Sequence, residues 1–177
     1  MIPALLGGSN PGAIAASGLK EAFVTLDIGL RLGRILKSRG YDVNYSRTED
    51  VTVSLAGRAQ MANDWGADYF ISIHCNSNEN PVFKGTSTYC FRLDTVASSL
   101  AQYVNDSLVE AIDTPNLGVM TANFAVLRRT TMPANLVETA FLSNPEEAAL
   151  LAEPVFRENC AVGIANGIDD FLNYRER

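Results

Sequence analysis

The sequence predicts a single α/β domain over residues 1–177, with a mixed, mostly parallel sheet of about six strands and helices on both faces. The length of 177 residues suits one domain, and no internal repeat or low-complexity linker divides the chain. Apolar residues at three- and four-residue steps indicate helices. These segments alternate with short β-branched or aromatic runs that indicate strands, and such alternation is typical of a layered α/β sheet.

Helical spacing accounts for five segments. In the first, Val24, Ile28 and Leu32 fall on one face, and Gly40 follows its last turn as a stop signal. The helices are expected at 21–39, 54–65, 96–112, in a short segment that starts at Pro145, and in a long C-terminal segment from Phe156 to Phe171.

Six short segments have the composition of strands. The run 69–74 combines aromatic and β-branched residues, and 41–46 alternates between apolar and polar residues. The strands are expected at 2–6, 41–46, 69–74, 85–91, 124–127 and 136–139.

Composition excludes several classes of function. The net charge is −6 and the basic residues are scattered, so a nucleic-acid partner is not expected. No stretch is long and apolar enough for a membrane span, and the first residues lack a secretory signal, so an export signal would lie outside this chain. The three cysteines lack the CxxC spacing of a thiolate zinc site and are read as free buried thiols, with a single disulfide as the alternative.

Three polar residues stand where an α/β sheet binds ligands. His74, the one histidine, ends an apolar strand; Glu138 lies within another; and Glu21 opens a helix. An imidazole with two carboxylates suits a hydrolytic zinc site. Each residue also has a structural explanation: a hydrogen-bonded strand-end histidine is common, and Glu21 is favourable beside the helix dipole. Glu138 is harder to explain structurally, because a carboxylate in an apolar strand is costly unless it is paired or functional.

The order of motifs along the chain resembles the zinc-dependent N-acetylmuramoyl-L-alanine amidases of the amidase_3 family. The likeness runs from about Gly7 to about Leu172 and rests on the number, order and spacing of its motifs. The matching stretches are 7–13, 18–21, 46–50, 54–58, 62–63, 72–76, 85–86, 123–128, 132–134 and 137–144.

This resemblance implies a site and a reaction. In the family, zinc is held by a histidine before the Gly-Gly of the first loop and by residues that match Glu21 and His74, and the glutamate that matches Glu138 is the general base. The substrate is peptidoglycan, and the bond cleaved joins N-acetylmuramic acid to L-alanine. We expect one zinc ion, substrate contacts from the matching residues Asn76, Asn123 and Arg128, a monomer, and action outside the cell or in the cell wall.

The chain departs from the family at Leu6, which occupies the place of the first zinc histidine. The remaining pair, Glu21 and His74, falls short of the three protein ligands typical of catalytic zinc. Cys75 is a poor substitute, because strand alternation points it to the face opposite His74. Glu138 could join the metal only by giving up its role as base.

Three explanations for Leu6 remain open at this point. The chain is a weakened amidase-fold protein that binds or regulates the cell wall, or an active amidase that recruits water or a carboxylate, or its first residues do not represent the functional protein. The leading hypothesis is a zinc amidase with impaired metal occupancy, and a peptidoglycan-binding module is the alternative. Autolysin, sporulation enzyme and phage lysin all fit the sequence.

Overall fold

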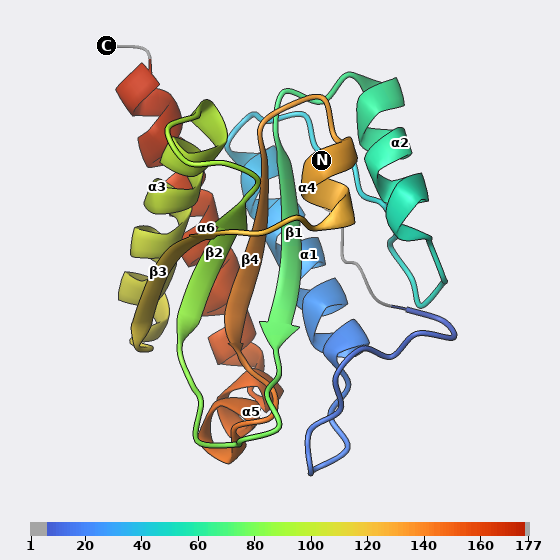
Figure 1. The fold of residues 1–177 in the computed structure, drawn as a ribbon, viewed down its shortest axis with the longest axis vertical. Coiled ribbons are helices and arrows are strands. Elements are labelled where there is room, and N and C mark those ends of the chain that lie inside the picture. Colours follow the sequence, from blue (N-terminus) through green and yellow to red (C-terminus); the bar gives the residue numbers. More distant parts are fainter. Residues whose placement is uncertain (1–6, 176–177) are drawn as a thin grey trace.

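The computed structural model describes residues 7–175 as a single α/β domain built on a four-stranded sheet (Figure 1). The strands are β1 (Phe70–Asn76), β2 (Thr86–Cys90), β3 (Asn116–Thr121) and β4 (Ala134–Phe141). The helices are α1 (Glu21–Ser38), α2 (Leu55–Trp65), α3 (Val96–Ile112), α4 (Ala125–Arg129), α5 (Pro145–Ala152) and α6 (Pro154–Arg175).

The sheet has the strand order β1-β4-β2-β3. β1 pairs with β4 in parallel and β2 pairs with β3 in parallel, whereas β2 and β4 are antiparallel. This pattern confirms the expected mixed, mostly parallel sheet. Because of these directions, the C-terminal ends of β1 and β4 lie at the same end of the strands, and the C-terminal end of β2 lies at the other end.

The described part of the chain contains four strands, fewer than the six or so expected for the whole chain. The expected strand at 2–6 lies outside the described residues. Segment 41–46 contains one bridge residue, Tyr45, and is not among the strands of residues 7–175. Residues 125–127 belong to α4 and Phe124 is its N-cap, since a short apolar run looks alike in a strand and in a helix.

β3 was not predicted. Its sequence, Asn116-Leu-Gly-Val-Met-Thr121, contains a glycine and lies at the sheet edge without a fully buried residue. Glycine and weak alternation hide an edge strand from pattern analysis. The five expected helices and the strands near 69–74, 85–91 and 136–139 are confirmed.

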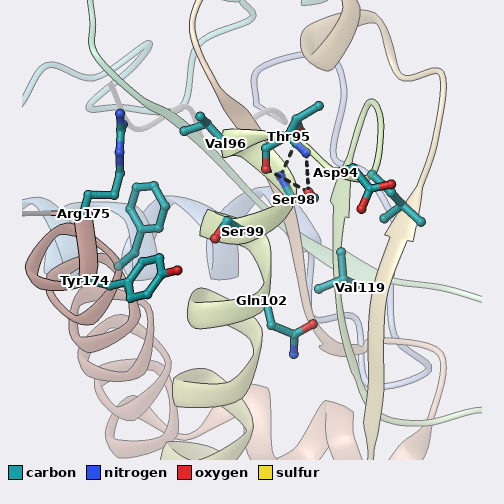
Figure 2. Close-up of a pocket in the computed structure, with 11 residues that line it drawn as sticks. Asp94, Thr95, Val96, Ser98, Ser99, Gln102, Val119, Tyr174 and Arg175 are labelled. Atoms are coloured by element: carbon teal, nitrogen blue, oxygen red, sulfur yellow. Dashed lines mark hydrogen bonds between the residues drawn. The ribbon is translucent and has the colours of Figure 1, made fainter. Parts of the chain in front are cut away.

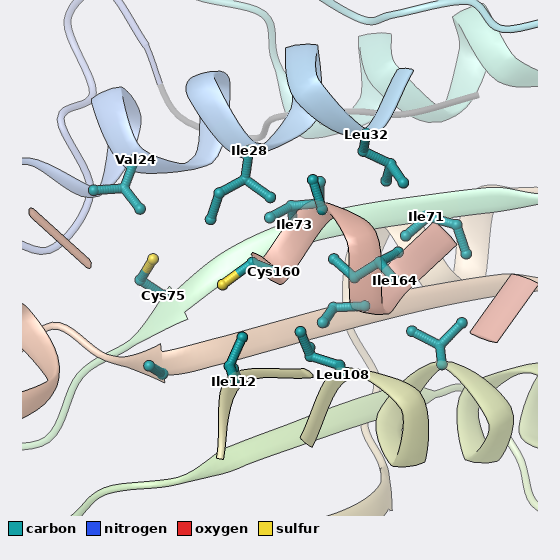
Figure 3. Packing of buried hydrophobic residues seen from close by; sticks show 14 of the residues in the cluster. Val24, Ile28, Leu32, Ile71, Ile73, Cys75, Leu108, Ile112, Cys160 and Ile164 are labelled. Atoms are coloured by element: carbon teal, nitrogen blue, oxygen red, sulfur yellow. The ribbon is translucent and has the colours of Figure 1, made fainter. Parts of the chain in front are cut away.

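Successive side chains along β1 point to opposite faces of the sheet. Ile71, Ile73 and Cys75 point into the main core, which α1, α3 and α6 cover (Figure 3). Phe70 points to the other face, where Leu136 of β4 packs with residues from α2 and α4. Helices therefore cover both faces, as expected, and the even-numbered β1 residues, His74 among them, face the α2/α4 side.

The main core depends on a close approach between α3 and α6. A Cβ atom added at Gly167 would lie 2.5 Å from the Cα of Val104, and one added at Gly163 would lie 2.8 Å from the Cα of Leu108. Both glycines are four residues apart on α6 and meet the backbone of α3. The two helix axes can be this close only because these positions lack side chains.

Gly167→Ala is therefore expected to destabilise the protein by about 1–3 kcal/mol through overpacking, although alanine is the better helix former. Urea unfolding measures the change in the free energy of unfolding. Gly57→Ala in α2 is the control, because the nearest atoms there belong to side chains, and no loss of stability is expected. A stabilising effect of Gly167→Ala would contradict the close packing of α3 against α6.

Candidate active site

His74 and Glu138 lie side by side on the α2/α4 face of the sheet. The parallel register of β1 and β4 pairs His74 with Glu138, and the antiparallel register of β2 and β4 pairs Glu138 with Ser87. The three residues form a row across three strands. The β1–β4 register is interrupted immediately after His74, so the row stands where the parallel pairing becomes irregular. His74 lies near the C-terminal end of β1 and Glu138 in the second half of β4, as expected, whereas Ser87 lies near the start of β2, which runs in the opposite direction.

Glu21 reaches the same row from the start of α1. Its Oε1 lies 2.9 Å from His74 Nδ1 and also accepts the Cys75 backbone N–H at 3.2 Å. Its Oε2 accepts the Ala13 N–H at 2.9 Å, while the Glu21 N–H donates to the Ala13 carbonyl at 2.9 Å. The Glu21 carboxylate is buried and is held by His74, Cys75 and Ala13. A glutamate that is favourable only because of the helix dipole would need none of these contacts.

Sequence reasoning missed the support that lies behind Glu21. Arg47 is buried, and its Nη2 donates to the carbonyl of Ala22, the residue after Glu21, at 2.7 Å. Its Nη1 donates to the Glu49 carbonyl at 2.9 Å. Arg47 thus ties the loop before α2 to the first turn of α1. The motif Ser46-Arg47-Thr48 was visible in the sequence, but burial of the arginine was not.

Glu138 has the electrostatics of a base in a poorly solvated site. Burial raises the pKa of its carboxyl from 4.5 to about 7, with His74 opposing the rise and Glu21 adding to it. Its Oε2 is enclosed and has no hydrogen-bond partner within the described residues, and the same is true of His74 Nε2. A carboxyl with a pKa near neutrality can exchange a proton with water or an amine at physiological pH.

This raised pKa makes the stability of the metal-free protein depend on pH. Below about pH 4.5 the carboxyl is protonated in both states and contributes nothing. As the pH rises towards about 7, the unfolded chain releases the proton while the folded chain keeps it, so the folded state loses up to about 3 kcal/mol. Glu138→Gln should therefore be the more stable protein at about pH 8 and similar to the wild type at about pH 4.5.

Urea unfolding in a chelating buffer tests this expectation. Titrating groups that do not interact with Glu138 are common to both proteins and cancel in the difference. A difference in unfolding free energy that does not change with pH would show that Glu138 titrates normally.

The expected substrate contacts fall in two places. Asn76 follows His74 by two residues on β1 and is partly buried, with its Oδ1 accepting the Ser77 N–H at 2.8 Å. Asn123 and Arg128 are exposed and paired, because Arg128 Nη1 donates to the Asn123 carbonyl at 3.2 Å and to its side-chain oxygen. Phe124 packs edge-on against Tyr89, two residues from Ser87, with 5.3 Å between ring centroids. The loop that carries Asn123 therefore borders the same face of the sheet.

The described residues supply two of the three expected metal ligands. Glu21 and His74 converge, but no group of three or more His, Cys, Asp or Glu side chains that could hold a metal ion occurs within 7–175. Leu6, the expected position of the replaced ligand, lies outside the described residues. Cys75 is a buried free thiol whose Sγ contacts Thr139 on the main-core side, so it does not replace the missing ligand.

A separate hollow of about 680 Å³ lies between the start of α3 and the end of α6 (Figure 2). Thr95, Gln102 and Tyr174 are among its lining residues. α3 follows the C-terminal end of β2, and β2 is antiparallel to β4. The hollow therefore lies at the N-terminal end of β4, whereas the His74–Glu138 row lies towards its C-terminal end. It is not part of the candidate active site.

The fold and the site together define an α/β domain in which the buried carboxyl of Glu138 lies beside the converging side chains of Glu21 and His74. The chain belongs to the amidase_3 family of N-acetylmuramoyl-L-alanine amidases, whose family model matches residues 1–170. These enzymes are zinc-dependent and hydrolyse peptidoglycan.

Individual relatives agree with this assignment. The chain is 38% identical over 175 residues to the sporulation-specific N-acetylmuramoyl-L-alanine amidase of Bacillus subtilis, with 96% of this chain and 66% of the relative covered. It is 37% identical over 179 residues to the endolysin of Bacillus phage SPP1, with 97% and 65% covered. The chain thus spans slightly less than two thirds of these relatives.

A solved structure has the same fold. The catalytic domain of CwlV, an N-acetylmuramoyl-L-alanine amidase from Bacillus (Paenibacillus) polymyxa, superposes with a TM-score of 0.93 at 33% identity. The match covers 97% of this chain and 96% of that domain.

Within the described residues, no helix is long and apolar enough to cross a membrane.

Proposed function

We propose that residues 1–177 form one catalytic domain that hydrolyses the amide bond between N-acetylmuramic acid and the L-alanine of the peptidoglycan stem peptide. The observation that carries the proposal is the carboxyl of Glu138, which is held beside His74 with an unpaired buried oxygen and a pKa raised to about 7. A group of this kind is suited to general acid–base catalysis at neutral pH.

We propose Glu21 and His74 as protein ligands of one zinc ion. Their facing atoms lie 2.9 Å apart, and carboxylate oxygen with imidazole nitrogen is a donor set that zinc accepts. When bound, zinc supplies polarisation of the scissile carbonyl and a lowered pKa for the attacking water. With two such ligands we expect weaker binding than at a three-ligand site.

The remaining chemistry belongs to this chain's own side chains. Glu138 takes a proton from the attacking water and returns it to the nitrogen of L-alanine as the amide bond breaks. The hydrogen bonds from Ala13 and Cys75 keep Glu21 in one orientation while this happens. Asn76, Asn123 and Arg128 contact the glycopeptide, and Arg128 provides the positive charge that an anionic stem peptide requires.

The second candidate is a wall-binding module with little or no catalysis. The observation that favours it is the ligand count, since the described residues bring only two metal-binding side chains together. In either case we propose peptidoglycan as the partner, a monomeric chain, and a place of action outside the cytoplasm or in the cell wall. Sporulation enzyme, autolysin and phage lysin all remain compatible with this proposal.

Digestion of purified peptidoglycan sacculi, with and without added zinc, tests the proposed reaction. We expect new L-alanine amino termini to appear with time, without new reducing sugar ends, and to disappear when a chelator removes the metal. Mass spectrometry of the purified protein reports its zinc content. Binding to sacculi without release of amino termini at any zinc concentration would overturn the proposed hydrolase and support the wall-binding module.

A further inference from the structure

An unusual set of buried polar atoms surrounds Glu138. Within the described residues, six buried side-chain nitrogen or oxygen atoms have no hydrogen-bond partner. Three of them lie in the row across β1, β4 and β2, and they belong to His74, Glu138 and Ser87. Buried polar groups in proteins are normally paired, so a concentration of unpaired ones marks a place where partners are recruited during function.

Ser87 is the member of this set that faces the base directly. The register of β2 and β4 places it opposite Glu138, on the side away from His74. Side chains directly opposite each other across neighbouring strands have Cβ atoms about 4.5–5.5 Å apart. A rotation of the serine hydroxyl or of the carboxyl is therefore enough to bring Ser87 Oγ and Glu138 Oε2 together, directly or through one water.

The two unpaired groups are chemically complementary. A serine hydroxyl donates one hydrogen bond, and a carboxylate oxygen accepts it. Ser87 is 1% exposed, so a polymeric substrate cannot reach its hydroxyl, whereas Glu138 is only partly buried. Ser87 can then act on the reaction only through a neighbouring group, and Glu138 is the residue opposite it in the register.

We infer that Ser87 is a positioning residue for the general base: its hydroxyl holds Glu138 Oε2, which leaves the other carboxyl oxygen to face the scissile amide. The inference rests on the proposed function, because it assigns Ser87 to the same reaction. Ser87 itself takes no proton and contacts no reacting atom.

Ser72 provides a matched control for this role. It is also a serine with an unpaired, fully buried hydroxyl on the same face of the sheet. Its neighbour in the register of β1 and β4 is Leu136 rather than Glu138. Removing its hydroxyl changes the packing in the same way but leaves the base untouched.

Steady-state kinetics on a soluble muramyl-peptide substrate tests the inference. Ser87→Ala should lower kcat about tenfold or more with KM within about twofold, because misplacing a catalytic group slows the chemical step rather than binding. Ser72→Ala should leave kcat within about twofold, and Ser87→Thr, which keeps the hydroxyl, should restore most of the loss. Equal effects at both serines, or a raised KM with unchanged kcat, would overturn the role.

A second measurement does not depend on turnover. In a double-mutant cycle, the shift in urea midpoint caused by Ser87→Ala should differ between the wild type and the Glu138→Gln background. The shift caused by Ser72→Ala should be the same in both. If the chain hydrolyses nothing, coupling in this cycle still supports the contact between Ser87 and Glu138, and additive shifts for Ser87→Ala overturn it.

Discussion

Glu138→Gln is expected to lower kcat for peptidoglycan hydrolysis by about 10²–10⁴-fold, the usual contribution of a general base. Glutamine has nearly the same shape as glutamate, but its amide cannot accept a proton from the attacking water. Glu138 lies opposite His74 in the β1–β4 register. It is the one carboxylate among the residues of the four described strands, so no other strand residue could replace it as the base. Release of L-alanine amino termini from sacculi measures the loss.

Two controls separate lost chemistry from lost structure. Glu138→Gln removes a carboxyl that is costly to ionise in its buried site, so the variant should be at least as stable as the wild type at about pH 8. Glu146→Gln changes an exposed glutamate that pairs with Lys84 and should leave the rate unchanged. Full activity in Glu138→Gln would remove this residue from the reaction.

Leu6→His is expected to raise zinc affinity by at least about 100-fold, since changes that only reorient an existing ligand already alter affinity 10–100-fold. The resemblance to the amidase_3 family places a zinc histidine immediately before Gly7-Gly8, where this chain has leucine. A third protein ligand completes the number typical of catalytic zinc. We expect kcat/KM at limiting zinc to rise in parallel.

Competition with a chromogenic chelator measures the change in zinc affinity. Leu5→His is the matched control, because it adds a histidine one residue from the expected ligand position. An equal gain from both variants would indicate non-specific metal binding. No gain from Leu6→His would favour the wall-binding module over the hydrolase.

The sequence predicted the parts of the site that depend on burial pattern and chain order. His74 ends an apolar run, Glu138 interrupts another, and Glu21 opens a periodic helix, and the structure brings all three together. The metal and substrate roles of these residues stay predictions. α4 was misread because a five-residue helix is too short for its periodicity to show.

Other features could not be read from the sequence because they depend on which strands become neighbours. Ser87 lies 51 positions before Glu138, and only the antiparallel pairing of β2 with β4 sets them opposite each other. The burial of Arg47 behind Glu21 depends likewise on a loop closing over α1. A one-residue shift in strand register would turn Ser87 away from the site, and nothing local in Thr86-Ser87-Thr88 fixes that register.

The row of residues across β1, β4 and β2 also bears on when the domain becomes competent during folding. Its members come from positions 74, 138 and 87, so one parallel and one antiparallel pairing must both be complete before they meet. Pairings of high sequence separation form late and slowly. Catalysis should then appear only with the last cooperative step, and recovery of activity during refolding should lag behind recovery of helical signal. Under the proposed function, a partly folded chain would release no L-alanine amino termini from sacculi.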